Sequence, residues 1–166
     1  NNQIFLAPGW NKSMRRGWLL EKSAELEASG IYFWQASRSQ GQLPSEPKSS
    51  WYGQLIAGAK QCSNPWLPVL KNFTKGIAEL ASYCTYFDQL FFLWEKEGRK
   101  NKINPEIFKR PCKTLIVIGP EGGFTQKETD ILLKHDYAPV SLGNRILRWE
   151  TAALLCLGLA WFCNDS

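Results

Sequence analysis

Short apolar runs alternate with longer amphipathic segments along this chain. Runs of strand length occur at 4–7, 31–36, 89–94, 115–118 and 138–142. The run 115–118, Leu-Ile-Val-Ile, is apolar without interruption, which is typical of a strand covered on both faces. Segments of helical character lie between these runs, at 13–29, 49–62, 73–84, from 125 onward and at 147–163. Strands that alternate with helices predict an α/β fold with a mostly parallel sheet.

Two predicted helices carry further information about packing. The closing segment, 147–163, is apolar on almost every side, so we expect it to be buried on more than one side. The first helical segment, 13–29, has an apolar face, and its inward candidates are Met14, Trp18, Ala24 and Leu26. Between the elements, the polar segment 38–50 and the basic segment 96–113 are expected to be exposed loops.

The composition narrows the class of protein. At 166 residues the chain is long enough for one domain with a real core, supplied in part by eight Trp and nine Phe. Its net charge of +5 is compatible with a nucleic-acid partner without establishing one. The run 152–163 is too short to span a bilayer, so no membrane anchor is expected.

The cysteines argue against a metal site and against a disulfide framework. Five cysteines are widely spaced without a C-x-x-C pair, and His135 is the one histidine. We expect reduced, mostly buried thiols, no metal and a cytoplasmic location.

A glycine-rich turn follows the apolar run 115–118. In Gly-Pro-Glu-Gly-Gly at 119–123, the glycines permit unusual backbone angles and Pro120 restricts one of them. Thr125 and Glu128 then fit a capping box, which predicts that a helix starts there. Strand, turn and helix start together predict a ligand-binding loop at the carboxyl end of a strand.

The ligand of this loop is neither a dinucleotide nor a nucleotide phosphate of the usual kinds. The segment 119–124 lacks both G-x-G-x-x-G and the lysine of G-x-x-x-x-G-K-[ST]. Glu121, inside the turn, would repel a phosphate. An acidic glycine loop suits a ligand that carries positive charge or offers hydrogen-bond donors.

Two segments resemble those of a known family. Ile-Gly-Pro-Glu-Gly-Gly-Phe at 118–124, followed by Glu128, and Leu-Gly-x-Arg-Ile-Leu-Arg-x-Glu-Thr-Ala at 142–152 closely resemble the RsmE family. Its members are 16S ribosomal RNA uracil N(3)-methyltransferases that use S-adenosylmethionine. They belong to the SPOUT superfamily, which implies an α/β fold with a C-terminal trefoil knot and a homodimer formed through the closing helix at 147–163.

The resemblance covers nearly the whole chain, with departures. Members of the family usually carry an N-terminal PUA-like RNA-binding domain, which we expect to be absent here, leaving a single SPOUT domain over 1–166. In the family segment A-E-Q-x-x-R-x-x-x-P, Gln61 and Pro68 match, whereas Lys60 and Asn64 replace an acid and an arginine. These differences put independent capture of RNA in question.

The resemblance also implies a cofactor site formed by three loops. Backbone groups would hold adenine and ribose, and apolar side chains would form the walls. The residues expected to bind S-adenosylmethionine are Leu93, Glu95, Ile118, Gly119, Pro120, Gly122, Gly123, Leu142, Gly143, Ile146 and Leu147.

Catalytic roles follow from the chemistry that methylation of a uracil nitrogen needs. Arg148 is expected to orient the base or to stabilise the oxyanion that develops on its carbonyl. Glu121 and Glu150 are candidate proton acceptors. Structural alternatives stay open: Glu121 would fix the turn through backbone N–H groups, and Glu150 would pair with Arg145 or Arg148. The residues expected to contact RNA are Arg15, Arg16, Lys22, Gln61 and Arg145.

Two other functions stay open at this point. One is a SPOUT ribose 2′-O-methyltransferase acting on tRNA or rRNA, against which the Leu-Arg-x-Glu-Thr-Ala signature argues. The other is an RNA-binding or ribosome-assembly module without catalysis, which the departures at Lys60 and Asn64 favour.

Overall fold

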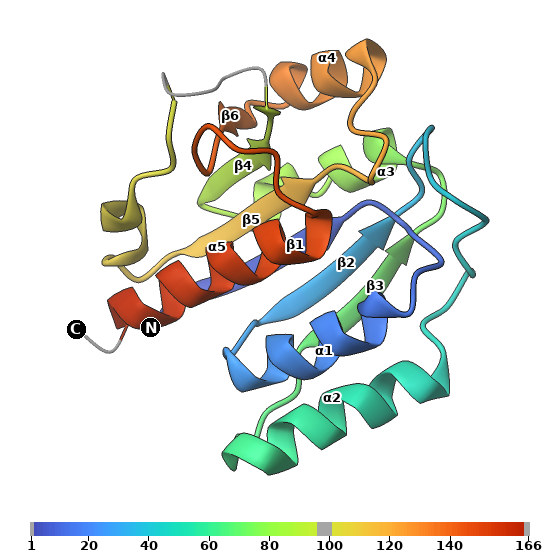
Figure 1. The fold of residues 1–166 in the computed structure, drawn as a ribbon. Helices are drawn as coiled ribbons and strands as arrows, with labels where there is room; N and C mark the ends of the chain where they lie inside the picture. Colours follow the sequence, from blue (N-terminus) through green and yellow to red (C-terminus); the bar gives the residue numbers. More distant parts are fainter. Residues whose placement is uncertain (1, 96–100, 165–166) are drawn as a thin grey trace.

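One six-stranded sheet forms the centre of the protein. The computed structural model describes residues 2–95 and 101–164. Every neighbouring strand pair is parallel, and the order is β3-β2-β1-β5-β4-β6 (Figure 1). The strands are β1 (Gln3–Pro8), β2 (Gly30–Trp34), β3 (Val69–Phe73), β4 (Gln89–Leu93), β5 (Lys113–Ile118) and β6 (Ala138–Val140). The predicted α/β fold with a parallel sheet is confirmed.

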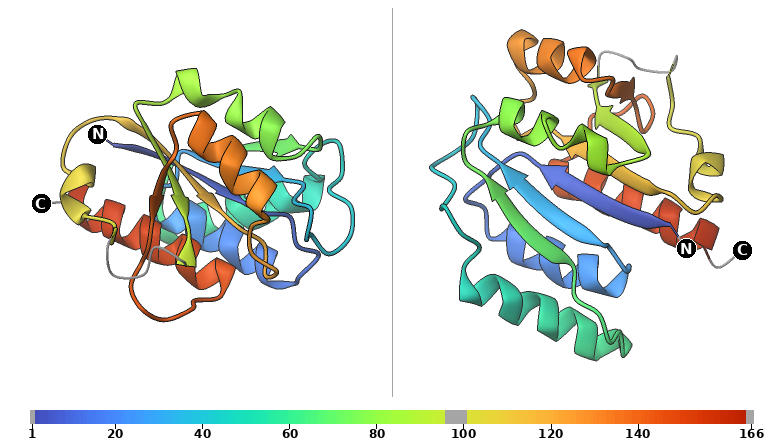
Figure 2. Two further views of the ribbon diagram at one scale, coloured as in Figure 1. Left: turned by 90° about the horizontal axis from the view of Figure 1, so that it is seen from above. Right: turned by 180° about the vertical axis from the view of Figure 1, so that it is seen from behind.

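Helices cover both faces of this sheet. One face is covered by α1 (Arg15–Glu25), α2 (Ser49–Cys62) and α5 (Trp149–Asn164), and the other by α3 (Ile77–Ala81) and α4 (Gln126–Lys134), as Figures 1 and 2 show. Short 3-10 turns are η1 (Cys84–Tyr86) and η3 (Pro105–Phe108). Each face of the sheet therefore has its own core.

The apolar run of β5 explains why that strand is central. Leu115 and Val117 pack into the core beside α3 and α4, whereas Ile116 and Ile118 pack into the core beside α1, α2 and α5. Successive side chains of a strand point to opposite faces, so a strand between two cores needs apolar residues at every position. β5 accordingly pairs with β1 on one side and β4 on the other.

The order of the strands determines where a ligand can bind. The chain builds β1, β2 and β3 outward in one direction, and then places β5, β4 and β6 on the other side of β1. Parallel strands end at one edge of the sheet, and ligands of such sheets bind at the carboxyl ends near a reversal of strand order. The loops after β1, β4, β5 and β6 are thus the structural candidates for a site.

Several sequence predictions were wrong in detail. The segment predicted as a helix at 73–84 contains the end of β3, the short α3 and η1. β3 was missed because Lys71 and Asn72 interrupt its apolar pattern, as is tolerated in a strand at the edge of a sheet. Gly76, with φ +87°, then delays the start of α3 to Ile77.

The inward face of α1 also differs from the prediction. Met14 and Trp18 are 97% and 47% exposed, while Ala24 is buried as expected. Leu19 and Leu20 form the buried stripe instead, and α1 packs with it against α2 and α5. The two large apolar side chains at 14 and 18 misled the assignment, because helical spacing alone does not say which apolar stripe faces the core.

The predictions for the cysteines and for the basic segment 96–113 agree with the structure only in part. All five thiols are free, but only Cys156 is buried, and Cys62 is exposed. In the basic segment, Ile103 and Phe108 are buried against the core beside α5, so the described part is more than an exposed loop. Residues 96–100 of that segment lie outside the described residues. No described helix has the length and apolar character needed to cross a membrane.

Candidate active site

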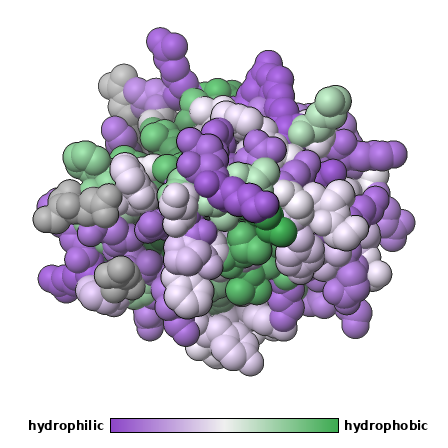
Figure 3. Space-filling view, turned by 90° about the horizontal axis from the view of Figure 1, so that it is seen from below, coloured by the Kyte–Doolittle hydropathy of each residue, from purple (hydrophilic) through white to green (hydrophobic). Residues whose placement is uncertain are grey.

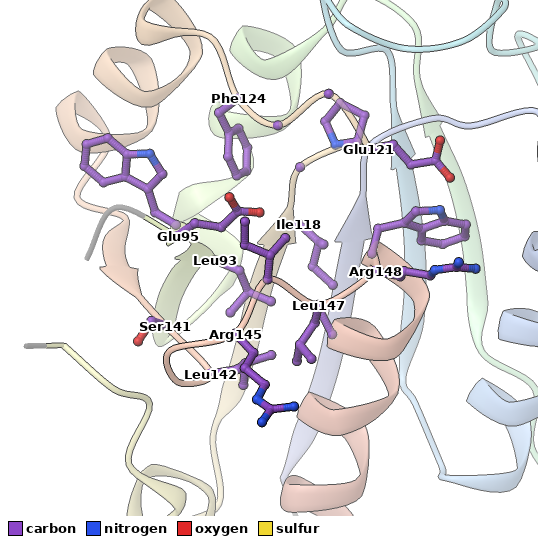
Figure 4. Close-up of a pocket in the computed structure, with 18 of the residues that line it drawn as sticks. Leu93, Glu95, Ile118, Glu121, Phe124, Ser141, Leu142, Arg145, Leu147 and Arg148 are labelled. Atoms are coloured by element: carbon purple, nitrogen blue, oxygen red, sulfur yellow. The ribbon is translucent and has the colours of Figure 1, made fainter. Parts of the chain in front are cut away.

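A cavity of about 880 Å³ opens at the carboxyl ends of β4, β5 and β6 (Figure 4). Three loops form most of its lining: 93–95 after β4, 118–124 after β5 and 141–149 after β6. These segments are far apart in sequence, and the fold brings them together as predicted. All eleven residues predicted for the cofactor line this cavity.

Apolar side chains gather at the centre of the cavity. Figure 4 shows Leu93, Ile118, Leu142 and Leu147 close together in the middle of the site. Each comes from the end of a strand or from the loop that follows it, so the sheet edge fixes their positions. Small-molecule sites typically combine such an apolar surface with a few polar groups, and this volume is in their usual range.

Glycines shape the two longer loops. Gly123 has φ +67° and its N–H donates to the carbonyl of Pro120 at 2.8 Å, which closes the turn after β5. Gly143 has φ +130° in the loop after β6. A Cβ at either position would meet no atom within 4 Å, so the backbone conformation, not crowding, favours glycine.

The predicted capping box is present at the start of α4. Glu128 Oε2 accepts from the N–H of Thr125 at 2.8 Å, and Thr125 Oγ1 accepts from the N–H of Glu128 at 3.3 Å. The other carboxylate oxygen, Oε1, accepts from the N–H of Ser37 at 2.8 Å. The buried Glu128 therefore joins the loop after β2 to the end of the glycine turn.

Charged side chains surround the opening of the cavity. Among the residues that the structure describes, four arginines line it, together with Glu95 and Glu121. Figure 4 shows Arg148 and Glu121 on the same side of the site, with Arg145 lower in the view. The four arginines are Arg15, Arg38, Arg145 and Arg148. This excess of positive charge suits an anionic partner such as a nucleic-acid backbone.

Glu150 lies outside the lining of the cavity. It is 4% exposed, and its Oε1 accepts from Arg15 Nη1 at 2.5 Å, while its Oε2 has no hydrogen-bond partner among the described residues. The expected pairing with Arg145 or Arg148 was wrong. The partner is Arg15, which the packing of α1 against α5 brings to it.

The residues predicted to contact RNA separate into two groups. Arg15 and Arg145 line the cavity, whereas Arg16, Lys22 and Gln61 do not. Lys22 is paired with Glu25 at 2.7 Å, and Gln61 is exposed near the end of α2.

Arg16 is held within the protein. Its guanidinium lies 4.9 Å from the ring centre of Trp10 and 5.0 Å from that of Trp51. Burial lowers the pKa of Arg16 from its ordinary value. Such stacking on aromatic faces holds the start of α1 in place and leaves the side chain little freedom to contact RNA.

Asn64, one of the departures from the family pattern, has a structural role. Its Nδ2 donates to the carbonyl of Ala24 at 3.0 Å near the end of α1, and its Oδ1 accepts from the N–H of Trp66 at 3.0 Å. It thereby fixes the turn after α2.

Sequence reasoning missed some residues of the cavity. Arg38 is the clearest case: it lies in the polar segment after β2, far in sequence from both glycine loops. The sequence feature that could have indicated Arg38 as a site residue is its position just after the carboxyl end of a strand. Further lining residues outside the predicted site include Ser13, Trp94, Ser141, Asn144 and Ala152.

Comparisons with known proteins agree with this geometry. Residues 1–161 match the family model of the RNA methyltransferase domain. The chain is 31% identical over 160 residues to ribosomal RNA small subunit methyltransferase E of Mesomycoplasma hyopneumoniae, covering 94% of this chain and 68% of that protein. It is 27% identical over 164 residues to the protein of the same name from Bacillus subtilis, covering 93% and 64%. The chain thus spans less than two thirds of the length of the Bacillus subtilis relative.

The fold has a close counterpart among solved structures. A structure from Legionella pneumophila, in complex with the bound cofactor SAM, superposes with a TM-score of 0.84 at 27% identity. The match covers 96% of this chain and 65% of that one.

Proposed function

Since the chain belongs to the RNA methyltransferase domain family, among the ribosomal RNA small subunit methyltransferases E, we propose that it methylates N3 of a uridine in 16S ribosomal RNA with S-adenosylmethionine. One observation carries the proposal: the three loops after β4, β5 and β6 meet in one cavity. Relatives with this name and a neighbour with bound SAM support it.

The residues of the cavity fit this cofactor. An apolar wall of Leu93, Ile118, Leu142 and Leu147 suits an adenine ring, and the glycine turns let backbone N–H and C=O groups approach a ribose. Glu95 and Glu121 add the acidic groups that favour a positively charged ligand. When bound, S-adenosylmethionine supplies an electrophilic methyl group on a sulfonium.

The chain's own residues must then prepare the uracil nitrogen. We assign Arg148, exposed at the cavity, to a uracil carbonyl oxygen, where its guanidinium stabilises the negative charge that develops as the N3 proton leaves. Glu121 is the proposed acceptor of that proton. Glu150 was an equal candidate in sequence, but its buried carboxylate is held by Arg15 and lies outside the cavity lining.

The proposed RNA partner fits the charges around the cavity. N3 of a paired uracil is engaged in the base pair, so the target must be single-stranded or turned out of its helix. Arg15 and Arg145 line the cavity, and we propose that both contact phosphates of the RNA backbone. A ribosomal substrate implies a cytoplasmic location.

A homodimer and a trefoil knot complete the proposal. Among the described residues, the side chains of Leu155 and Phe162 on α5 are 40% and 69% exposed, although this helix is apolar almost all round. Figure 3 shows apolar surface exposed among hydrophilic side chains on one face of the molecule. We propose that a second copy covers α5.

The trefoil knot of SPOUT proteins is proposed from family membership. It would keep the loop after β6 against the loops after β4 and β5.

Two measurements on the wild-type chain test the function. Calorimetric titration should detect binding of S-adenosylmethionine, and labelled methyl groups should pass to 16S ribosomal RNA. Digestion of the product to nucleosides should give N3-methyluridine. Label on the ribose would support a 2′-O-methyltransferase instead. Absence of cofactor binding would exclude both enzyme functions and support a non-catalytic RNA-binding or assembly module.

The variant Arg148→Ala tests the catalytic assignment. Cofactor affinity should stay within about twofold, whereas kcat should fall by about a hundredfold, as when one oxyanion donor is removed. Arg110→Ala is the control, because Arg110 is exposed and lies outside the cavity lining. Equal loss of affinity and turnover in Arg148→Ala would show a structural role.

A further inference from the structure

The glycine turn after β5 has little internal support. Within 119–123, the N–H of Gly123 donates to the carbonyl of Pro120, and Glu121 and Gly122 are exposed. A turn with two or more glycines populates many conformations unless other contacts restrict it. Pro120, at the start of the turn, is buried and packs closely against Gly9. The contacts on the exposed part of the turn come from the loop after β2.

Arg38 provides the most direct of these contacts. Its Nη1 donates to the carbonyl of Gly122 at 2.7 Å and lies 3.5 Å from the carbonyl of Phe124. A Cβ placed on Gly122 would be 2.9 Å from Arg38 Cβ and 3.2 Å from its Cδ. The aliphatic part of Arg38 therefore packs closely over the backbone of Gly122 while its guanidinium holds two carbonyls.

The loop that carries Arg38 is itself firmly attached. The N–H of Ser37 donates to Glu128 Oε1 at 2.8 Å, and a tight turn joins Ala36 and Ser39 through bonds of 3.0 and 3.1 Å. Trp34 stacks on Phe124 with ring centres 5.8 Å apart and planes 12° from parallel. Arg38 thus extends from a well-supported loop onto the exposed part of the glycine turn.

We propose that Arg38 is a positioning residue that holds the turn 119–123 in the conformation needed to bind the cofactor. This rests on the proposed function, because the turn is part of the proposed cofactor site. A hydrogen bond from a charged donor to a carbonyl is stronger than one between neutral groups, and the guanidinium presents its donors in a fixed plane. Holding the turn in advance removes part of the ordering cost that a ligand would otherwise meet.

Arg38 differs from the other arginines of the cavity in the groups that its side chain contacts. Arg15 is held by Glu150, and we assign Arg148 to the substrate. Arg38 is the arginine for which bonds to the backbone of the glycine turn are described. Its loss should therefore change the turn itself, whereas loss of Arg145 or Arg148 should not.

The first test needs neither cofactor nor RNA. Amide hydrogen exchange is compared for the wild type, Arg38→Met, Arg38→Lys and the control Arg145→Met. We expect amides of the peptide that contains 121–125 to exchange about tenfold faster in Arg38→Met, as expected for one lost charged hydrogen bond. Arg38→Lys should lie between, because lysine keeps the charge without the fork, and Arg145→Met should match the wild type. Unchanged exchange in both Arg38 variants would overturn the proposal.

The second test follows the consequence for binding. In Arg38→Met the Kd for S-adenosylmethionine should rise about tenfold, with partial recovery in Arg38→Lys. At saturating cofactor, kcat should stay within a few-fold of the wild type, because Arg38 does not touch the reacting atoms. A fall in kcat with unchanged affinity would contradict a positioning role. If the wild type bound no cofactor, the proposed function would fail, while the exchange experiment would still decide whether Arg38 holds the turn.

Discussion

Arg15 and Arg16 show how strongly the environment separates two identical neighbouring residues. Arg15 lines the cavity and pairs with Glu150, whereas Arg16 lies over Trp10 and Trp51. Successive residues of a helix point about 100° apart, so adjacent side chains meet different neighbours. The same residue type thus serves the site at one position and anchors a helix at the next.

The effect of burial on a single residue can be measured by comparing the reactivity of two cysteine thiols. Cys156 on α5 is buried in the core, and this burial raises the pKa of its thiol to about 12. Cys62 on α2 is exposed. Iodoacetamide at pH 8 to 9 should alkylate Cys62 and leave Cys156 unmodified, because the thiolate is the reactive form and Cys156 stays protonated until the pH approaches its raised pKa. Peptide mass spectrometry reads the result. Denaturant should make both react, and rapid native labelling of Cys156 would show that α5 is not packed as described.

At the scale of elements, the start of α4 combines a local signal with a long-range contact. Thr125 and Glu128 complete a capping box that any helix of this sequence could form. Glu128 additionally binds the N–H of Ser37, which lies 91 positions earlier. One carboxylate therefore caps a helix and attaches a distant loop.

The two contributions can be separated by mutation. Thr125→Ala should lower the free energy of unfolding by about 1 kcal/mol, as other lost N-caps do. Glu128→Ala should cost about 2–3 kcal/mol, because it also leaves the N–H of Ser37 without its partner. Urea unfolding measures both, with the exposed Lys127→Ala as the control. Equal losses in the two variants would mean that the bond to Ser37 contributes nothing.

For the whole molecule, the sheet lies between two cores and leaves the cavity at its carboxyl edge. The helix α5 packs on one face of the sheet and still exposes apolar side chains. Exposed apolar surface of this kind marks interaction sites in soluble proteins. The proposed dimer would cover it and place two copies of the cavity in one assembly.

The dimer is testable with a matched pair of variants. Leu155 on α5 and Leu133 on α4 are 40% and 43% exposed, but they belong to opposite faces of the sheet. Sedimentation velocity should show a dimer for the wild type and for Leu133→Glu, and a monomer for Leu155→Glu, because an unpaired charge is costly in an apolar interface. A monomeric wild type, or a dimeric Leu155→Glu, would contradict the proposal.

The sequence by itself determined the features that depend on neighbouring residues. The continuous apolar run of β5, the glycine turn after it and the capping box of α4 each follow from residue types within a few positions. The family signature at 118–124 and 142–152 added which loops belong together, and all the residues expected to hold the cofactor line one cavity. Local chemistry was sufficient there because backbone conformation and strand burial are encoded locally.

Only the tertiary structure decided the features that join distant segments. The edge position of β3 made its polar residues acceptable, and the packing of α1 against α5 gave Glu150 its partner Arg15. The contact of Arg38 with the glycine turn spans 84 positions. No periodicity or motif within one segment reports such pairs, because their energy arises only when the sheet brings the ends of different strands to one edge.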